Sequence, residues 1–185
     1  MFAHVCPWWG GYFIDNRFRR LFHKPELILA PFVRPGMETF DFGCGMGLFS
    51  LAMAEIVGEE GRVVAADLQS KMLDAVNRRA EAKGVAEIVA THLCQKESLN
   101  LEGAFDFILA FYAAHEAPDS ARLFDEFASL LKPDGRLLLV EPRGHVTGRA
   151  FQSQLDEAKR VGLHPIERPN VRLSRAALLG RVEVD

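Results

Sequence analysis

The sequence has few of the residues and patterns that mark unusual classes of protein. Its 185 residues include three cysteines and two tryptophans, and no apolar run approaches the roughly 18 to 20 residues of a membrane-spanning helix. Cys6, Cys44 and Cys94 stand far apart, which argues against a disulfide framework and favours a reducing compartment. The N-terminal residues lack the basic segment and the long apolar stretch of a signal peptide. We therefore expect a cytoplasmic protein without a membrane span.

A basic surface, internal repeats and linkers are also absent. The formal net charge is -3, with an acidic middle and mildly basic ends, whereas a nucleic-acid-binding surface needs a concentrated basic face. Hydrophobic residues make up 49% of the chain, which is enough for a sizeable core. No Gly/Ser-rich or low-complexity stretch divides the sequence. We expect one domain over residues 1–185 that does not bind nucleic acid.

From residue 38 onward, short apolar runs alternate with segments of helical periodicity. Ser70, Asp119 and Thr147 are predicted to cap helices, and "KPDG" at 132–135 is predicted to form a turn. Strands are predicted at 38–42, 61–67, 86–93, 104–111 and 136–142, with two closing strands within 163–179. Helices are predicted at 47–58, 70–84 and 120–131, with a last helix after Thr147. Strands separated by single helices predict a doubly wound α/β sandwich, with ligands at the carboxyl ends of the strands.

The segment "DFGCGMG" (41–47) begins at the end of the first predicted strand and places three glycines behind an acid. A dinucleotide fold requires G-x-G-x-x-G, but here Leu48 stands where the third glycine belongs. Asp41 would repel a pyrophosphate and suits an ammonium group, while Asp67, at the end of the second strand, can accept hydrogen bonds from ribose hydroxyls. Ammonium, ribose and adenine together indicate S-adenosylmethionine.

Four segments in register strengthen this interpretation. "TFDFGCGMG", "VVAADLQSKML", "FDFILAFYAAHEAPD" and "LKPDGRLLLVEP" resemble, in order and spacing, the motifs of class I S-adenosylmethionine-dependent methyltransferases. The sequence is most similar to the small-molecule enzymes of the ubiquinone/menaquinone C-methyltransferase group, over about residues 36–142. The resemblance implies a Rossmann-like, seven-stranded, mostly parallel sheet with an antiparallel last strand, S-adenosylmethionine as cofactor and a small-molecule acceptor.

The resemblance also implies a set of cofactor-binding residues. The glycine loop would line the methionine end of the cofactor, Asp67 would bind the ribose, and Leu68 would flank the adenine. Gln95 stands where many relatives have an acid for the adenine amino group, and Phe111 would lie near the transferable methyl. We interpret Cys44 as a small packing residue of this loop and not as a nucleophile. The full predicted set is Asp41, Gly43, Cys44, Gly45, Gly47, Asp67, Leu68, Gln95 and Phe111.

Candidate catalytic residues follow the fourth and fifth predicted strands. His115 is the first candidate for a general base because an imidazole titrates in the useful range, and Tyr112 and His145 are the further candidates. The alternative is that His115 only shapes a helix start. A second alternative is a metal site, for which ligands would come from His4, Cys6, His115, Glu116 and His145. No pair of them has the spacing of a zinc motif, so we expect no metal.

The segments outside the resembling core have their own predicted roles. Residues 1–35 form a predicted helical extension, either a lid over the substrate pocket or an ordinary packing helix; residues 143–185 hold the last helix and the closing strands. A helix in the extension would present Ile14, Phe18, Leu21 and Phe22 on one face and end at Pro25. Its aromatic residues, as a lid, would favour an apolar or aromatic acceptor.

Three other functions were weighed against a small-molecule methyltransferase. A nicotinamide-dependent oxidoreductase is disfavoured by Asp41 and by the missing third glycine. A non-catalytic S-adenosylmethionine-binding module is disfavoured because every predicted cofactor position other than Gln95 matches the family. Nucleic-acid methylation is disfavoured because no Asn/Asp-Pro-Pro-aromatic motif follows the fourth strand to grip a flipped base.

Overall fold

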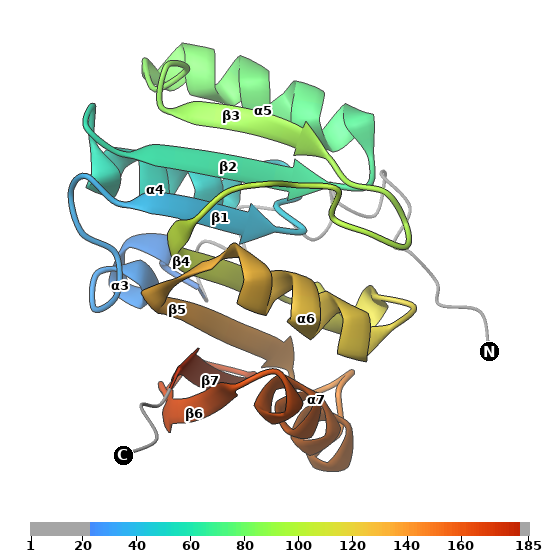
Figure 1. Cartoon of the computed structure of the whole chain (residues 1–185). Coiled ribbons are helices and arrows are strands. Elements are labelled where there is room, and N and C mark those ends of the chain that lie inside the picture. Colours follow the sequence, from blue (N-terminus) through green and yellow to red (C-terminus); the bar gives the residue numbers. More distant parts are fainter. Residues whose placement is uncertain (1–22, 182–185) are drawn as a thin grey trace.

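The computed structural model describes residues 23–181, which form one seven-stranded sheet covered by helices on both faces (Figure 1). The strand order is β3-β2-β1-β4-β5-β7-β6; β1 to β5 pair in parallel, and β7 is antiparallel to both of its neighbours. This confirms the predicted doubly wound sheet with an antiparallel last strand. The strands are β1 Glu38–Phe42, β2 Arg62–Asp67, β3 Val89–Leu93, β4 Phe105–Phe111, β5 Leu131–Pro142, β6 Leu163–Glu167 and β7 Ser174–Arg181.

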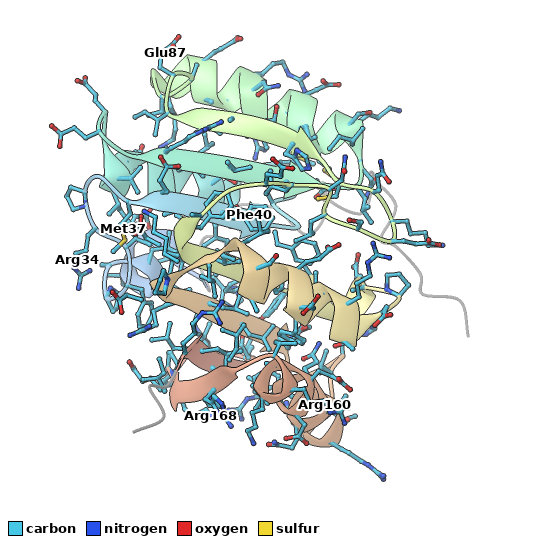
Figure 2. The ribbon with its side chains drawn as sticks, viewed as in Figure 1. Arg34, Met37, Phe40, Glu87, Arg160 and Arg168 are labelled. Carbon is cyan, nitrogen blue, oxygen red and sulfur yellow. The ribbon has the colours of Figure 1, made fainter. Side chains whose placement is uncertain are left out.

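The helices divide the core into two layers. The helices are α3 Pro25–Leu29, α4 Leu48–Val57, α5 Ser70–Lys83, the 3-10 helix η1 Ala114–Glu116, α6 Ser120–Leu130 and α7 Gly148–Arg160. Side chains of α6 and α7 pack with Phe40 and Ile108 in one apolar cluster, while those of α3, α4 and α5 pack with Phe107 and Leu109 in another. Alternate residues of β4 thus face opposite layers, as a sheet covered on both sides requires. Phe40 lies inside the molecule, whereas Glu87 and Arg160 point outward from its ends (Figure 2).

Two of the three predicted helix caps are confirmed. Asp119 accepts a hydrogen bond from the backbone N–H of Arg122 at 3.0 Å, and Thr147 accepts one from Ala150 at 3.1 Å. The prediction for Ser70 is wrong, because Gln69 is the N-cap of α5 and Ser70 is already helical. The carboxylate of Asp67 accepts a hydrogen bond from the Gln69 N–H at 2.9 Å. This contact holds Gln69 in the extended conformation of an N-cap, so the helix begins one residue after Gln69, at Ser70.

The predicted turn at 132–135 is also wrong, since these residues lie within β5. The pairing of β5 with β4 shifts register between Phe105 and Phe107, so the extra residues are accommodated as an irregularity of the strand. Lys132 binds the carboxylate of Asp106 at 2.8 Å across this irregularity. A side chain at Gly135 would lie 2.7 Å from the Phe105 carbonyl oxygen, so the glycine allows the two strands to stay close. Residues 132–135, whose composition is typical of a turn, therefore form part of the irregularity of β5.

The N-terminal helix predicted through Ile14, Phe18, Leu21 and Phe22 lies outside the described residues. Pro25, expected to end that helix, is instead the first residue of α3. This position suits proline because its missing N–H costs nothing in the first turn of a helix. The Arg34 side chain closes the other end of α3 by donating to the carbonyl of Ala30 at 2.7 Å.

Candidate active site

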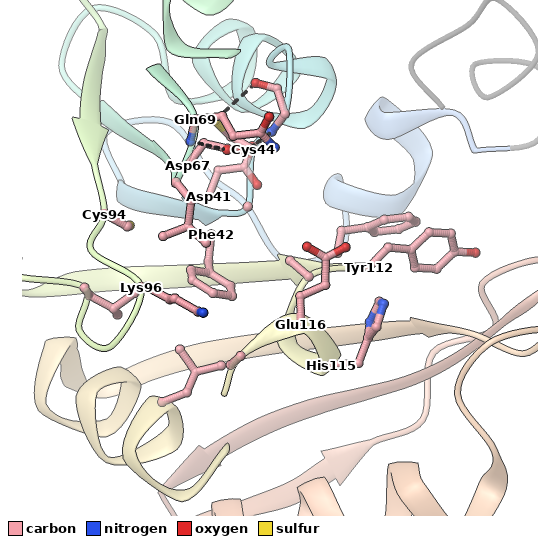
Figure 3. A pocket seen from close by; sticks show the side chains of 18 of the residues that line it. Asp41, Phe42, Cys44, Asp67, Gln69, Cys94, Lys96, Tyr112, His115 and Glu116 are labelled. Carbon is pink, nitrogen blue, oxygen red and sulfur yellow. Dashed lines mark hydrogen bonds between the residues drawn. The ribbon is translucent and has the colours of Figure 1, made fainter. Parts of the chain in front are cut away.

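A large pocket opens at the carboxyl ends of the central parallel strands (Figure 3). Its volume is about 500 Å³, and it is lined by the loops after β1, β2, β3 and β4 and by the start of α6. The strand order changes direction between β1 and β4, where ligands of doubly wound folds bind. The pocket therefore lies where the fold predicts a ligand site.

The glycine loop forms the floor at one end of the pocket. Gly43, Gly45 and Gly47 all have positive φ, of 67°, 53° and 83°, a conformation that side chains disfavour. A Cβ on Gly43 would lie 2.4 Å from the Cβ of Ala113, whereas one on Gly45 would meet nothing within 4 Å. Gly43 and Gly45 line the pocket; Gly47 does not and serves as the N-cap of α4.

Two carboxylates stand beside this loop. Asp67 accepts hydrogen bonds from the N–H groups of Gly45 at 3.0 Å and Gln69 at 2.9 Å. Burial raises the pKa of Asp67, although these N–H groups partly oppose the shift. Asp41 is buried and accepts a hydrogen bond from the Ser50 hydroxyl at 2.5 Å. Both acids line the pocket, as the sequence predicted.

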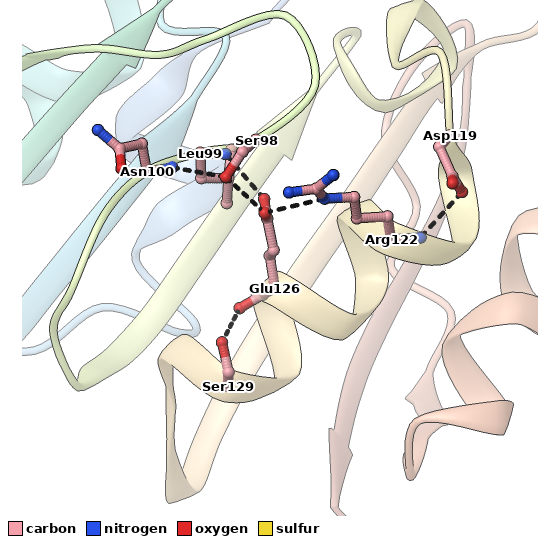
Figure 4. A network of polar contacts seen from close by, with 7 residues as sticks. All are labelled: Ser98, Leu99, Asn100, Asp119, Arg122, Glu126 and Ser129. Atoms are coloured by element: carbon pink, nitrogen blue, oxygen red, sulfur yellow. Dashed lines mark hydrogen bonds and ion pairs between the residues drawn. The ribbon is translucent and has the colours of Figure 1, made fainter.

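The opposite wall comes from the segment after β3. The exposed Gln95 of this segment lines the pocket, as does Leu68, which follows β2 and is 37% exposed. The segment is held by Glu126 of α6, whose carboxylate accepts from the Ser98 hydroxyl at 2.7 Å and from the Leu99 N–H at 2.8 Å (Figure 4). Glu126 also lines the pocket and was not predicted. Its contacts join residues far apart in the sequence, so no local pattern marks it.

Cys44 and Cys94 both line the pocket as free thiols. Burial raises the pKa of Cys44 well above its ordinary value and, with the charges of Asp67 and Glu126, raises that of Cys94 to about 12. A thiol with such a pKa is a poor nucleophile because the thiolate is the reactive form. This agrees with the interpretation of Cys44 as a packing residue.

The three predicted catalytic residues meet at the far end of the pocket. Tyr112, His115 and His145 all line it, and the rings of the two histidines lie 4.9 Å apart, centre to centre. Tyr112 has a φ of 61°, an uncommon conformation for a residue with a side chain, directly after β4. Its hydroxyl lies 2.6 Å from the hydroxyl of Ser174, so the ring is fixed at both ends.

His115 has a carboxylate partner that lies outside the pocket lining. Its Nδ1 is 2.6 Å from Oε2 of Glu141, a fully buried residue of β5. Burial alone would lower the pKa of His115, but the hydrogen bond and charge of Glu141, with the charge of Glu116, outweigh it and raise the pKa. The imidazolium form of His115 is therefore stabilised in the folded protein.

An aromatic wall joins the two ends of the pocket. The ring of Phe111 lies 4.3 Å from that of Phe49 and 4.5 Å from that of Tyr112, centre to centre. His23 packs edge-on against Phe111 at 5.2 Å. Phe111, Phe49 and Tyr112 line the pocket, so a ligand there meets aromatic surface between the glycine loop and the histidines.

Two absences can be stated for residues 23–181. No group of three or more His, Cys, Asp or Glu side chains is arranged to hold a metal ion, and His4 and Cys6 of the metal alternative lie outside this range. Within the same part of the chain, every helix is too short or too polar to cross a membrane.

The amino-acid sequence is similar to those of curated methyltransferases. Curated relatives include a demethylmenaquinone methyltransferase of Bacillus cereus, 28% identical over 109 residues. That match covers 59% of this chain and 46% of the relative, so the chain spans less than half the length of the curated relatives it matches.

Solved structures share the fold at low sequence identity. A SAM-dependent methyltransferase from Aquifex aeolicus has a TM-score of 0.83 at 19% identity, covering 93% of this chain and 97% of that one. A SAM-dependent O-methyltransferase from Thermotoga maritima has a TM-score of 0.67 at 18% identity, covering 88% and 66%. These likenesses confirm the Rossmann-like methyltransferase fold.

A family model also matches the chain. The model described as "Methyltransferase domain" matches residues 34–166, which is well over half of the chain. It includes the glycine loop, Asp67, the aromatic wall and His115. The chain therefore belongs to the methyltransferase domain family.

Proposed function

We propose that this protein transfers a methyl group from S-adenosylmethionine to a small-molecule acceptor. S-adenosylmethionine is the cofactor that the family and its structural neighbours imply. The observation that carries the proposal is the placement of two carboxylates, Asp41 and Asp67, beside a left-handed glycine loop in one pocket. Ammonium and ribose hydroxyl groups are donors that suit carboxylates, whereas the phosphates of a nicotinamide dinucleotide do not.

The residues present fit this cofactor. Asp41 and the glycine loop with Cys44 would hold the methionine end, and Asp67 would accept from the ribose. Leu68 and Gln95 would contact the adenine, and Phe111 would lie along the reacting centre. A cavity of about 500 Å³ is within the size range of small-molecule sites.

When bound, S-adenosylmethionine supplies an electrophilic methyl group on a sulfonium sulfur. The protein's own contribution is to align the acceptor and to remove its proton where the reacting atom carries one. Tyr112 and His115 lie at the end of the pocket away from Asp67 (Figure 3), and the ring of His145 lies 4.9 Å from that of His115, so we assign all three to the acceptor.

The lining of the acceptor end supports a ring-bearing substrate. Phe49, Phe111 and Tyr112 offer aromatic surface, and the demethylmenaquinone methyltransferases act by their name on a ring-bearing compound. We therefore propose an apolar or aromatic acceptor and no nucleic-acid substrate. The free thiols Cys44 and Cys94 support a cytoplasmic location, because a reducing compartment keeps thiols free. We treat residues 1–185 as one domain.

Ligand-induced stabilisation tests the cofactor. S-adenosylmethionine and S-adenosylhomocysteine should each raise the melting temperature, and NAD should not. Asp67→Ala should weaken binding of S-adenosylhomocysteine, measured by calorimetry, by about 1–3 kcal/mol, because a charged acceptor is lost. Asp74→Ala, on the exposed side of α5, is the matched control and should bind normally. Equal stabilisation by NAD, or unchanged affinity in folded Asp67→Ala, would contradict the proposal.

The acceptor itself is found by transfer of a labelled methyl group. Purified protein with labelled S-adenosylmethionine should label at least one member of a panel of quinols, phenols, amines and thiols. Labelling of nucleic acid alone would contradict a small-molecule acceptor.

A further inference from the structure

A buried chain of hydrogen bonds runs from the pocket into the last helix. Nδ1 of His115, in η1, contacts Oε2 of Glu141 at 2.6 Å, and Nε2 of Gln154, in α7, donates to Oε1 of Glu141 at 2.9 Å. Glu141 is 0% exposed and Gln154 is 8% exposed. Neither lines the pocket, whereas His115 does. Side chains of η1, β5 and α7 thus meet at the carboxylate of Glu141.

A fully buried carboxylate needs compensation for the water that it has lost. The side-chain hydrogen-bond partners of Glu141 are one amide and one imidazole, and the cation of Arg175 lies on the paired position of β7. His115 is the titratable group that binds the carboxylate directly. An ionised carboxylate only accepts hydrogen bonds, so Nδ1 of His115 must carry the proton in this pair. Nε2 is then the ring nitrogen that remains for the pocket. Glu141 therefore selects the tautomer of neutral His115.

We propose that Glu141 and Gln154 position His115 as the general base of the methyl transfer, with Nε2 taking the proton of the acceptor. Both are positioning residues, since they act through His115 and do not reach the pocket. The inference rests on the proposed function and narrows its substrate class: the reacting oxygen, nitrogen or carbon of the acceptor carries a removable proton.

The proton transfer balances without another reactant. The proton of the acceptor moves to Nε2, and the electron pair left on the acceptor forms the new bond to the methyl carbon. The electron pair of the carbon–sulfur bond that breaks stays on sulfur. His115 is left as an imidazolium beside the charge of Glu141 and returns its proton to water afterwards.

Other groups face His115 and set the pH at which it can act. Glu116 follows it in η1, and the exposed His145 lies with its ring 4.9 Å away. Glu141 and Glu116 raise the pKa of His115 against the effect of burial, and a charged His145 would oppose them. The neutral base therefore becomes available at a higher pH than for an ordinary histidine, and turnover should rise with pH along an acidic limb.

Three variants distinguish the effect of the hydrogen-bond relay from Gln154 through Glu141 to His115 from a general effect on packing. Glu141→Gln keeps the shape of the side chain and removes its charge, and Gln154→Met removes the donor to Oε1. Gln152→Met is the matched control, because Gln152 lies on the exposed side of the same helix and bonds only to Asp156. NMR titration of the histidine ring nitrogens, with His115→Asn to assign the signals, reads the relay without cofactor or acceptor.

The NMR experiment tests whether Glu141 and Gln154 set the tautomer and the pKa of His115. We expect neutral wild-type His115 to be protonated at Nδ1, and Glu141→Gln to lower its pKa. Gln154→Met should shift the pKa less, and Gln152→Met should leave it unchanged. An unchanged His115 pKa in folded Glu141→Gln would overturn the proposal. If Glu141→Gln does not fold, wild-type pKa and tautomer in Gln154→Met would overturn it instead.

The kinetic experiment decides the role in catalysis. With an acceptor from the screen, His115→Asn should lower kcat by ~10²–10⁴. Glu141→Gln should lower kcat at the plateau by ~10–100-fold and move the acidic limb to lower pH, by analogy with partners that orient catalytic histidines. Wild-type kcat and acidic limb in Glu141→Gln would overturn the proposal. Failure of the cofactor to bind in calorimetry would instead overturn the proposed function, so the two failures are distinguishable.

Discussion

Gly43→Ala tests whether the glycine loop is held in place by the segment after β4. Gly43 has a φ of 67°, and an added Cβ would lie 2.4 Å from the Cβ of Ala113. The left-handed backbone should cost about 1–2 kcal/mol for alanine, and the overlap about 1–3 kcal/mol more. We therefore expect a loss of about 2–5 kcal/mol in the free energy of unfolding.

The two costs can be separated with matched variants. Gly84→Ala should show the backbone cost alone, because Gly84 has a φ of 72°, ends α5 and has no neighbour within 4 Å of an added Cβ. The double variant Gly43→Ala with Ala113→Gly should recover the overlap cost, since it removes the opposing methyl. Urea unfolding of wild type, Gly43→Ala, Ala113→Gly and the double variant gives a double-mutant cycle. The expected coupling between the two positions is about 1–3 kcal/mol.

Strict additivity in that cycle would refute the reasoning, because it would mean that Gly43 and Ala113 do not constrain each other. A coupling comparable to the overlap cost would link the cofactor loop after β1 to the segment that carries Tyr112 and His115. The glycine would then be needed for two reasons, its backbone conformation and the contact.

Two further predictions concern the other polar contacts. Glu126→Ala should reduce the free energy of unfolding by about 1–3 kcal/mol, because the Ser98 and Leu99 donors lose a charged acceptor. The control Arg122→Ala removes only an exposed ion pair of 3.5 Å and should change the free energy of unfolding by about 0–0.5 kcal/mol. Equal effects of the two variants in urea unfolding would contradict this assignment. The pKa of His115 is raised on folding, so its protonation stabilises the fold fully below its unfolded pKa of about 6.5, and this contribution is lost as pH rises through the higher folded pKa. The difference in unfolding free energy between wild type and His115→Asn should therefore shrink from pH 6 to pH 9, and a difference that grows would contradict the raised pKa.

The fold, and the grouping of Asp41, Asp67 and the glycine loop in one pocket, could be predicted from the sequence because their signals are local. Asp41 lies near the end of one strand, the glycines follow that strand directly, and Asp67 ends the next, so the parallel pairing of β1 with β2 brings them together. Gly47 shows the limit of such reasoning. It belongs to the motif, yet its position as N-cap of α4, close to Val76, could not be told from spacing alone.

The arrangement around His115 could be predicted from the sequence only in part. His115 follows β4 and was predicted, whereas its partner Glu141 lies within β5, and their pairing depends on the register of β4 against β5. Gln154 had a signal that went unused: it shares a helical face with Phe151, Leu155 and Ala158, all buried. A polar side chain in an apolar stripe requires a buried partner. Which partner it finds is decided by how α7 packs, and no sequence pattern gives that.

The strand order has a consequence for synthesis of the chain. β1, β2 and β3 are consecutive and can pair through local crossovers, but the other edge of β1 waits for β4, whose paired residues are Phe107 to Ala110. At about 5–20 residues per second, the ribosome needs on the order of 3 to 15 seconds to extend the chain from β1 to β4. During that interval Phe40 and Phe42 stand on an open, apolar strand edge, the kind of edge that pairs with other chains. We therefore expect β1 to be a site where the nascent chain can pair wrongly until β4 is made.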